Sequence, residues 1–504
     1  MAKKQNIILP FERHLVLFRY MLGEIGLAEL QTIGKKLNDV EYEGVDESGN
    51  TFFFHHIARV AQVKGCAITK DELREYDERI GRYTRQIGEK RGGLKLKYFQ
   101  YVALLFTEMY LDRYFANREQ FCDSLNEFIA AEYSATMGAL NIEPYSLDKM
   151  NKLAYMCATG SGKTLVMHIN ILQFSFYLKR AKRLNSNIDI NKIIVLSPNE
   201  SMSRQHLDEL KLSNISAGIF VKDGGFFGNP KEDVVIIDMN KLKEEGKVKT
   251  VSVDSFERNN LVLVDEAHRG MSSSDGVWYD YRTRLCEDGF AFEYSATLKQ
   301  ALNSNSNKTE DRRLMQEYGK SIIMDYSYKY FYNDGYGKDY RIYNLKDGID
   351  KDHKFRYLTG CLMSFYQQVK YVAERQSAIS KFNIENPLLV FVGNRVTASA
   401  SKEELSDVEE VLAFIDAFVR NKQKSIGAIN AVLREETGLV DKSGRDIFTH
   451  DFNALYDMFG TMPDAQTVFE DMLRLVFNTD TTADEPRLHV EAIKQVQGEI
   501  AMKI

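Results

Sequence analysis

The segment Cys157–Thr164, with the sequence CATGSGKT, contains the residue types of a loop that binds phosphate groups. Its glycines let backbone N–H groups curl around an anion, and a helix that starts directly after the loop adds positive potential. Lys163 would reach the β- and γ-phosphates of ATP, and the Thr164 hydroxyl would bind Mg²⁺. The residues predicted to hold the nucleotide are Thr159, Gly160, Ser161, Gly162, Lys163 and Thr164.

The loop departs from the usual phosphate-loop pattern at one position, and one alternative remains. Cys157 stands where the usual phosphate-loop pattern has glycine. The alternative is a chance Gly-Ser-Gly turn before a helix. The Lys-Thr pair and the flanking strand and helix favour the phosphate loop.

Two adjacent carboxylates, Asp265 and Glu266, follow the apolar run Leu261–Val264. Ligands of open α/β sheets lie at the carboxyl ends of the strands, where these side chains are expected. Asp265 would hold Mg²⁺, directly or through water, and Glu266 would orient and deprotonate an attacking water. Alone, the four-residue motif Asp-Glu-Ala-His at 265–268 could instead form a solvated turn after the strand.

A third group of polar residues is predicted to couple the nucleotide site to neighbouring elements. Ser295 and Thr297 follow another apolar run, and His268 ends the acidic motif. Small hydroxyl groups there can bridge two elements by hydrogen bonds. Alone, Ser-Ala-Thr is more often an ordinary turn, so its weight comes from its position 30 residues after Asp265.

The elements that would position these side chains can be read from the apolar pattern. Short, nearly continuous apolar runs indicate strands that are covered on both faces, and amphipathic helices between them favour a doubly wound parallel α/β sheet. The predicted strands are Leu153–Cys157, Ile193–Leu196, Val234–Ile237, Leu261–Val264 and Ala291–Tyr294.

Outside this region the pattern changes. Residues 1–145 are predicted to be mainly helical, except that Thr51–His56 is more typical of a strand or a buried aromatic turn. Residues 331–382 form a connector with a helix near 362–372. Leu388–Val392 is predicted to open a second α/β domain, followed by a helix with one apolar face over 408–419.

The phosphate loop, the Asp-Glu-Ala-His motif and the Ser-Ala-Thr motif, in this order, resemble superfamily 2 helicases and translocases. The wording of the motifs and the helical N-terminal region are most similar to the res subunit of type III restriction enzymes. The resemblance implies a RecA-like ATP-binding domain at 146–330 and a partial second RecA-like domain at 383–504. Two further matches are softer. Ser197-Pro198-Asn199 with Gln205 resembles a family motif expected to touch the nucleic-acid backbone, and Pro387–Asn394 resembles the opening strand of the second RecA-like domain.

The resemblance implies an ATP hydrolase that uses Mg²⁺ to move along DNA, in a restriction or phage-defence system with a methyltransferase or nuclease partner subunit. The arginine motif that closes the ATP site in this family is not recognisable after residue 395. We therefore expect the chain to be the front of a larger enzyme, a natural truncation or half of a split system. Arginines that could take the missing role are Arg395, Arg445, Arg474 and Arg487.

The missing arginine motif favours an alternative, a subunit that binds ATP and a partner protein but does not translocate. A small-molecule kinase is disfavoured, because it has no use for the acidic motif at this spacing. Nucleic-acid-stimulated ATP turnover would separate a motor from an assembly subunit.

Composition limits the remaining classes. The 504 residues carry 66 basic and 72 acidic side chains, so the net charge gives no indication of nucleic-acid binding. It does not exclude such binding, because a local basic groove can follow phosphates while the rest of the surface is acidic. Five scattered cysteines without a CxxC pair argue against a disulfide framework and a cysteine zinc site, and predict a cytoplasmic protein. No stretch approaches the ~20 apolar residues that a membrane span needs. The basic segment 82–97 is either a phosphate contact or a solvated helix and loop, and His55-His56 favours a turn over a metal site.

Overall fold

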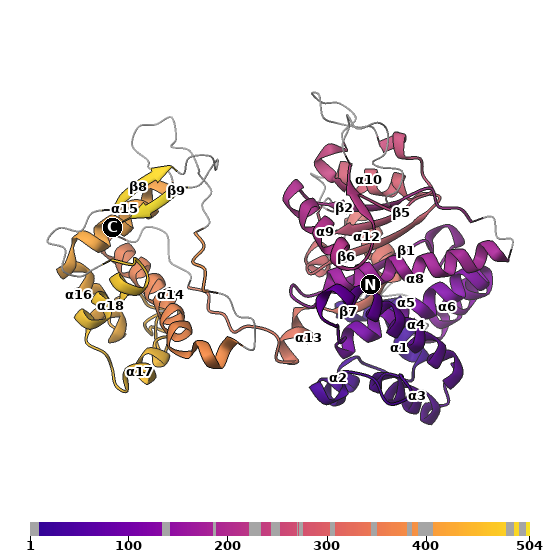
Figure 1. Ribbon diagram of the computed structural model, residues 1–504, viewed down its shortest axis with the longest axis horizontal. Helices are drawn as coiled ribbons and strands as arrows, with labels where there is room; N and C mark the ends of the chain where they lie inside the picture. The colour runs from indigo at the N-terminus through magenta and orange to yellow at the C-terminus, as the bar shows by residue number, and fades with distance from the viewer. Residues whose placement is uncertain are drawn as a thin grey trace, which may run out of the picture. The chain divides into compact units, whose positions relative to one another are not determined.

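The computed structural model describes residues 10–133, 142–184, 188–220, 233–242, 253–269, 271, 276–302, 308–343, 350–380, 386–391, 407–479, 488–492 and 500–503. The chain divides into two compact units, Met1–Asp339 and Tyr340–Ile504 (Figure 1). The first unit holds both the helical N-terminal region and the region with the predicted nucleotide motifs. Among the described residues, no helix is long and apolar enough to cross a membrane.

A seven-stranded parallel sheet forms the centre of the first unit, in the order β3-β4-β2-β5-β6-β1-β7. Its strands are β1 (Lys152–Cys157), β2 (Ile193–Ser197), β3 (Ala217–Ile219), β4 (Val234–Asp238), β5 (Leu261–Asp265), β6 (Phe290–Ser295) and β7 (Ile322–Tyr326). All five predicted strands are confirmed, while β3 and β7 were not predicted. Because the strands run parallel, β1, β5 and β6 end at one edge, where the motifs follow them.

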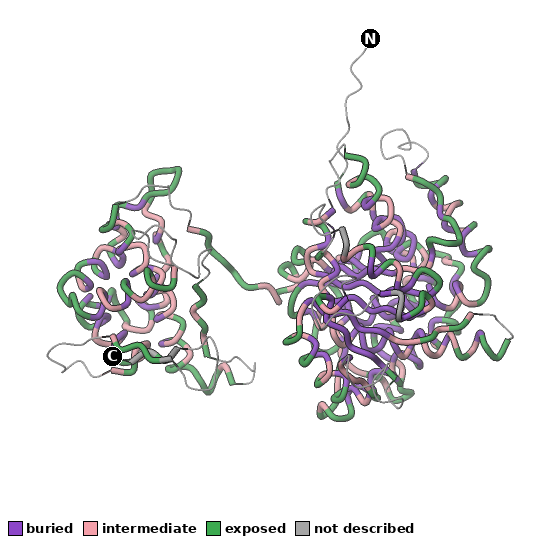
Figure 2. The backbone as a smooth tube through the Cα atoms, turned by 90° about the horizontal axis from the view of Figure 1, so that it is seen from above, coloured by how far each residue is buried: buried purple, intermediate pink, exposed green. Residues whose placement is uncertain are grey.

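Helices cover the sheet and join its strands. Those that follow the sheet strands are α8 (Lys163–Arg183), α9 (Glu200–Leu212), α10 (Gly276–Leu285), α11 (Leu298–Ala301), α12 (Thr309–Ser321) and α13 (Tyr328–Asn333). Figure 2 shows the buried chain of this unit gathered in its centre. Apart from the half-buried edge strand β3 and the first residues of β1 and β2, the strands are buried on both faces, which explains their nearly continuous apolar sequence.

The predicted helical N-terminal region is confirmed. It contains α1 (Val16–Glu24), α2 (Gln31–Leu37), α3 (Phe52–Lys64), α4 (Lys70–Gly88), α5 (Tyr98–Ala116) and α6 (Arg118–Tyr133). These helices share one continuous core with the sheet. Helix α5 packs along α8 and is buried at every position from Tyr98 to Leu111, so an N-terminal helix lies directly against the helix that follows the phosphate loop.

The prediction of a strand or turn at Thr51–His56 was wrong. Helix α3 begins at Phe52, and the Thr51 hydroxyl accepts a hydrogen bond from the N–H of Phe54 at 3.0 Å. Phe53, Phe54 and Ile57 lie on the buried face. A run of aromatic residues fits either a helix or a strand, and here the threonine cap and the apolar face selected the helix.

The second unit is mainly helical in its described part. It contains α14 (Lys351–Ile379), α15 (Asp407–Arg420), α16 (Lys422–Leu433), α17 (Asn453–Phe459) and α18 (Ala465–Leu475), with the antiparallel strands β8 (His489–Ala492) and β9 (Ile500–Lys503). These helices bury a separate hydrophobic core. The predicted helices near 362–372 and 408–419 are confirmed within α14 and α15.

The predicted strand Leu388–Val392 is absent from its described residues, 388–391, which have no regular secondary structure. Leu388 is 82% exposed and Val390 is 64% exposed, so this apolar run lacks the two-sided cover of a central strand. Val392 and the rest of the Pro387–Asn394 match lie outside the described residues. The described part of this unit contains no parallel sheet, in contrast to the expected start of a RecA-like domain.

Candidate nucleotide site

The loop between β1 and α8 contains two glycines with an uncommon backbone conformation. Gly160 and Gly162 have φ values of +85° and +83°, in the left-handed region that favours glycine. Gly162 is the N-cap of α8, so the first turn of a 21-residue helix faces the loop. The first N–H groups of a helix generally lack partners within the helix and can bind an anion. In α8 the N–H of Leu165 already donates to the carbonyl of Gly162 at 3.0 Å.

Two neighbouring elements hold this loop in place. The N–H of Ala158 donates to the carbonyl of Tyr326 at the end of β7, at 2.9 Å. The amide of Gln100, on α5, donates to the carbonyl of Ser161 at 2.9 Å. A Cβ atom at Gly162 would lie 2.4 Å from the Gln100 amide nitrogen, so this close approach also requires glycine. Sequence reasoning missed Gln100, although a glutamine within an apolar helix was a signal.

The structure brings the predicted lysine and both predicted carboxylates together. Lys163 Nζ lies 2.7 Å from Glu266 Oε1 and 3.6 Å from Asp265 Oδ1. Burial would lower the pKa of Lys163, but the two carboxylates outweigh burial and raise it. The cluster thus places one ammonium group and two carboxylates at the N-terminus of α8.

Asp265 is nearly buried at the end of β5, and each of its oxygens has a partner. Oδ1 accepts the N–H of Glu266 at 2.9 Å, and Oδ2 lies 3.1 Å from Nε2 of His206. Burial alone would raise the pKa of Asp265. The hydrogen bond from His206 and the charge of Lys163 outweigh burial and lower this pKa. Asp265 is therefore held as a carboxylate, the form that can bind a cation.

Glu266 occupies a turn that the surrounding structure holds in an uncommon conformation. Its φ of +51° lies in the left-handed region, which residues with a Cβ rarely adopt. The next residue fixes the turn on both sides. The N–H of Ala267 donates to the carbonyl of Tyr294, and the carbonyl of Ala267 accepts from the guanidinium of Arg282 at 2.7 Å. Arg282 was another contact that the sequence did not predict.

The predicted coupling residues also meet. His268 Nδ1 and Ser295 Oγ form a hydrogen bond of 2.8 Å, and the N–H of Thr297 donates to Ser295 Oγ at 3.0 Å. His268 Nδ1 is also 3.3 Å from Glu266 Oε2. Burial lowers the pKa of His268, partly offset by the charge of Glu266. The ends of β5 and β6 are thereby joined through side chains.

The residues of this loop fit a phosphate-bearing ligand. The Ser161 hydroxyl is buried and has no hydrogen-bond partner among the described residues. Thr159 and Gly160 are exposed, and Thr164 lies half-buried in the first turn of α8. The described residues contain no group of three or more acidic, histidine or cysteine side chains placed to hold a metal. A Mg²⁺ ion at Thr164 and Asp265 would therefore need further oxygen ligands from the nucleotide and water.

The residues of the softer sequence match that begins at Ser197 lie at the end of β2 and on α9. Asn199 caps α9, and Ser197 Oγ is 2.6 Å from Ser203 Oγ, while Gln205 is exposed. Their contact with the nucleic-acid backbone stays a prediction.

Other polar groups singled out in the sequence have structural partners. In the basic segment 82–97, Arg91 donates to Glu209 and Ser213, and Lys97 pairs with Glu43 at 2.5 Å. His55 pairs with Asp46.

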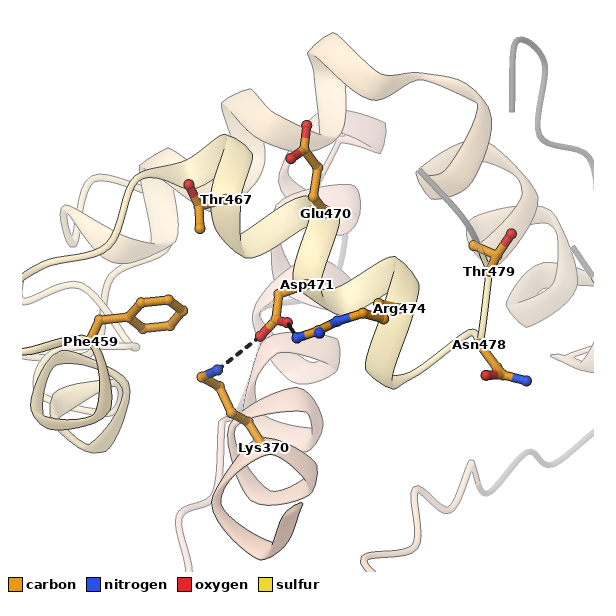
Figure 3. Close-up of a pocket in the computed structure, with 8 residues that line it drawn as sticks. All are labelled: Lys370, Phe459, Thr467, Glu470, Asp471, Arg474, Asn478 and Thr479. Carbon is orange, nitrogen blue, oxygen red and sulfur yellow. Dashed lines mark hydrogen bonds and ion pairs between the residues drawn. The ribbon is translucent and has the colours of Figure 1, made fainter. Parts of the chain in front are cut away.

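An open cavity of about 770 Å³ lies in the second unit, away from these motifs in sequence (Figure 3). Lys370 Nζ lies 3.0 Å from Asp471 and 4.6 Å from the centre of the Phe459 ring, and Arg474 also pairs with Asp471. The remaining lining residues are Thr467, Glu470, Asn478 and Thr479. The charged groups satisfy one another, and Arg474 is one of the arginines considered for the ATP site. Arg445, another of these arginines, pairs with Asp441, and Arg395 and Arg487 lie outside the described residues.

Comparison with known proteins matches residues 119–309 to the family model of the type III restriction enzyme, res subunit. Similar solved structures include the Sulfolobus solfataricus SWI2/SNF2 ATPase core in complex with dsDNA, at 11% identity and a TM-score of 0.26, covering 66% of this chain and 68% of that chain. The Pyrococcus furiosus Hef helicase domain has 14% identity and a TM-score of 0.26, covering 64% of this chain and 65% of that chain. No curated protein matches.

The family match covers β1, the phosphate loop, the acidic motif and the Ser-Ala-Thr turn in one segment. These motifs follow β1, β5 and β6, whose carboxyl ends lie at one edge of the parallel sheet. Residues 119–309 are therefore similar to a domain of the type III restriction enzyme res subunit.

Proposed function

We propose that this chain binds ATP with Mg²⁺ and hydrolyses it to move along DNA, as the motor of a restriction or phage-defence system. The observation that carries the proposal is the meeting of Lys163 with Asp265 and Glu266 at the N-terminus of α8. Phosphate loops need a lysine, an acidic metal ligand and a base at such an edge. The proposed ATP-binding domain spans residues 146–330.

Each residue of the cluster has a proposed role. Lys163 and the N–H groups of residues 159–164 bind the phosphates, and Thr164 and Asp265 hold Mg²⁺, which neutralises charge on the phosphate oxygens. Glu266 accepts a proton from the attacking water. In the structure Glu266 is paired with Lys163, so nucleotide binding must first separate them. Lys163 would exchange its carboxylate partner for phosphate oxygens, which frees Glu266 for its role as base.

His268, Ser295 and Thr297 have a proposed role in coupling. They link the carboxyl ends of β5 and β6. A movement of the Glu266 side chain would therefore displace His268 and, through it, the Ser-Ala-Thr turn. The buried Thr297 hydroxyl has no partner among the described residues and is free to gain one when the turn moves.

The partners are proposed from the family match. DNA would be held mostly by its phosphates and sugars, so sequence preference in this chain should be slight. Sequence recognition and cleavage would come from a methyltransferase or nuclease partner subunit. The cysteine pattern supports a cytoplasmic enzyme.

A second candidate is an assembly subunit that binds ATP and a partner protein without translocating. It is favoured by the helical character of the described part of residues 340–504, which differs from a RecA-like domain. Such a subunit would bind MgATP through the same loop, and DNA would not change its turnover.

The test is phosphate release by the chain with MgATP, measured alone and with single-stranded or duplex DNA. Lys163→Ala and Glu266→Gln provide the matched inactive variants. DNA-stimulated release that both variants lose would support the motor. Release that DNA does not change would favour the assembly subunit, and failure of the unmodified chain to bind MgATP would refute both.

A further inference from the structure

His206 is a buried histidine of α9 whose side chain reaches the predicted metal ligand. It is 5% exposed, and its Nε2 lies 3.1 Å from Oδ2 of Asp265. A carboxylate can only accept hydrogen bonds, so Nε2 must carry the proton and donate it. No sequence motif predicted this contact. The sequence had singled out the preceding residue, Gln205, which is exposed.

The helix that presents His206 is anchored at its start. Asn199 Oδ1 accepts the N–H of Met202, and Ser197 Oγ bonds Ser203 Oγ at the end of β2. Strand β2 pairs directly with β5, which carries Asp265. The donor and the acceptor therefore stand on two adjoining elements with little freedom to separate.

The hydrogen bond fixes the orientation of the Asp265 carboxylate. Oδ2 is held by His206, and this leaves Oδ1 toward Lys163 and the N–H of Glu266. Without the His206 donor, the carboxylate could rotate about its χ2 angle, which is a soft torsion. A ligand that must find its orientation on binding loses metal affinity, and partners of metal ligands typically contribute 10- to 100-fold.

We propose that His206 is a positioning residue that sets the affinity of the site for Mg²⁺ by orienting Asp265. The inference rests on the proposed function, in which Asp265 holds Mg²⁺. It assigns to α9 a direct link to the metal site, through a residue that touches neither nucleotide nor metal.

The experiment measures the MgCl₂ concentration that gives half-maximal binding of a non-hydrolysable ATP analogue to the full chain. His206→Leu removes the donor at similar size and should raise this concentration about 10-fold or more. His206→Gln places an amide N–H near the position of Nε2 and should stay within about 3-fold of the unmodified chain. Affinity for the analogue in EDTA should change little in either variant.

His168→Leu is the matched control. His168 is a buried histidine of α8 that bonds the Ser213 hydroxyl and no carboxylate. It should leave the Mg²⁺ requirement unchanged, whereas Asp265→Asn should exceed the effect of His206→Leu. If circular dichroism shows that His206→Leu does not fold, His206→Asn replaces it. The asparagine side chain places its amide near the position of Nδ1 and is too short to reach Asp265.

An unchanged Mg²⁺ requirement in the folded His206→Leu or His206→Asn variant would overturn the positioning role while leaving nucleotide binding intact. Equal losses in the leucine and glutamine variants would also overturn it, since packing and not the hydrogen bond would then be responsible. Absence of analogue binding by the unmodified chain is a different result, and it would refute the proposed function together with this inference.

Discussion

Lys163 and Glu266 lie 103 residues apart in the chain and form an ion pair of 2.7 Å at the N-terminus of α8. The lysine proposed for phosphate binding is thus occupied by the carboxylate proposed as the base. The charge of Asp265 and the hydrogen bond to Glu266 outweigh the burial of Lys163 and raise its pKa. A nucleotide that binds here would compete with Glu266 for the Lys163 ammonium group.

Replacing Lys163 with alanine should weaken MgATP binding by about 10- to 100-fold, because charge-assisted hydrogen bonds contribute about 1.5–3 kcal/mol. Calorimetry or a fluorescent nucleotide measures the affinity. Lys179→Ala, at an exposed position of the same helix, is the control and should bind as the unmodified chain does. Unchanged affinity in Lys163→Ala would refute the phosphate-loop assignment.

Glu266→Gln should lower ATP turnover by about 100- to 10,000-fold, because it keeps the size of the side chain but removes the base. MgATP binding should be retained, because the neutral glutamine amide no longer forms an ion pair with Lys163. Single-turnover phosphate release and equilibrium binding separate the two effects. A Glu266→Gln variant that turns over ATP at the full rate would remove Glu266 from the role of base.

Gln100→Leu should weaken nucleotide binding by about 2- to 10-fold, the equivalent of one hydrogen bond, although Gln100 lies outside the predicted site. Its amide no longer holds the carbonyl of Ser161, so the loop loses a support from α5. The control is Gln86→Leu, at an exposed position of α4. Equal affinity in the Gln100 and Gln86 variants would show that the loop keeps its shape without this bond.

Asp325→Asn should stabilise the chain at neutral pH. Asp325 is 2% exposed at the end of β7, and burial raises its pKa from 3.8 to about 6. The folded chain therefore binds this proton more tightly than the unfolded chain, and the free energy of unfolding decreases as the pH rises between these two values. At about pH 7 the variant should gain up to roughly 3 kcal/mol, and at about pH 4 the gain should nearly vanish.

Urea unfolding of Asp325→Asn at both pH values measures this difference. Asp123→Asn, at an exposed position of α6, is the control and should show no pH-dependent gain. A gain of the same size at both pH values would show that the effect does not come from the Asp325 proton.

The sequence by itself determined the local parts of this protein. Gly160 and Gly162 indicated a loop with left-handed backbone, and short apolar runs indicated buried parallel strands. Both signals depend on interactions within a few residues or on a simple burial pattern, so they can be read without knowing the neighbours. Parallel strands end at the same edge of a sheet, which explains why the acidic motif could be placed near the loop after β1. The strand order, with β6 between β5 and β1, was decided by the tertiary structure.

Tertiary structure alone decided which other side chains reach the site. Gln100 and Ser161 are 61 residues apart, and His206 and Asp265 are 59 residues apart. The sequence could not show these contacts, because a buried glutamine or histidine is a satisfied core residue unless its partner is known. The apolar run at 388–391 shows the opposite limit. Hydrophobic residues form a central strand only where neighbouring strands and helices cover both faces, and here the side chains of Leu388 and Val390 remain exposed.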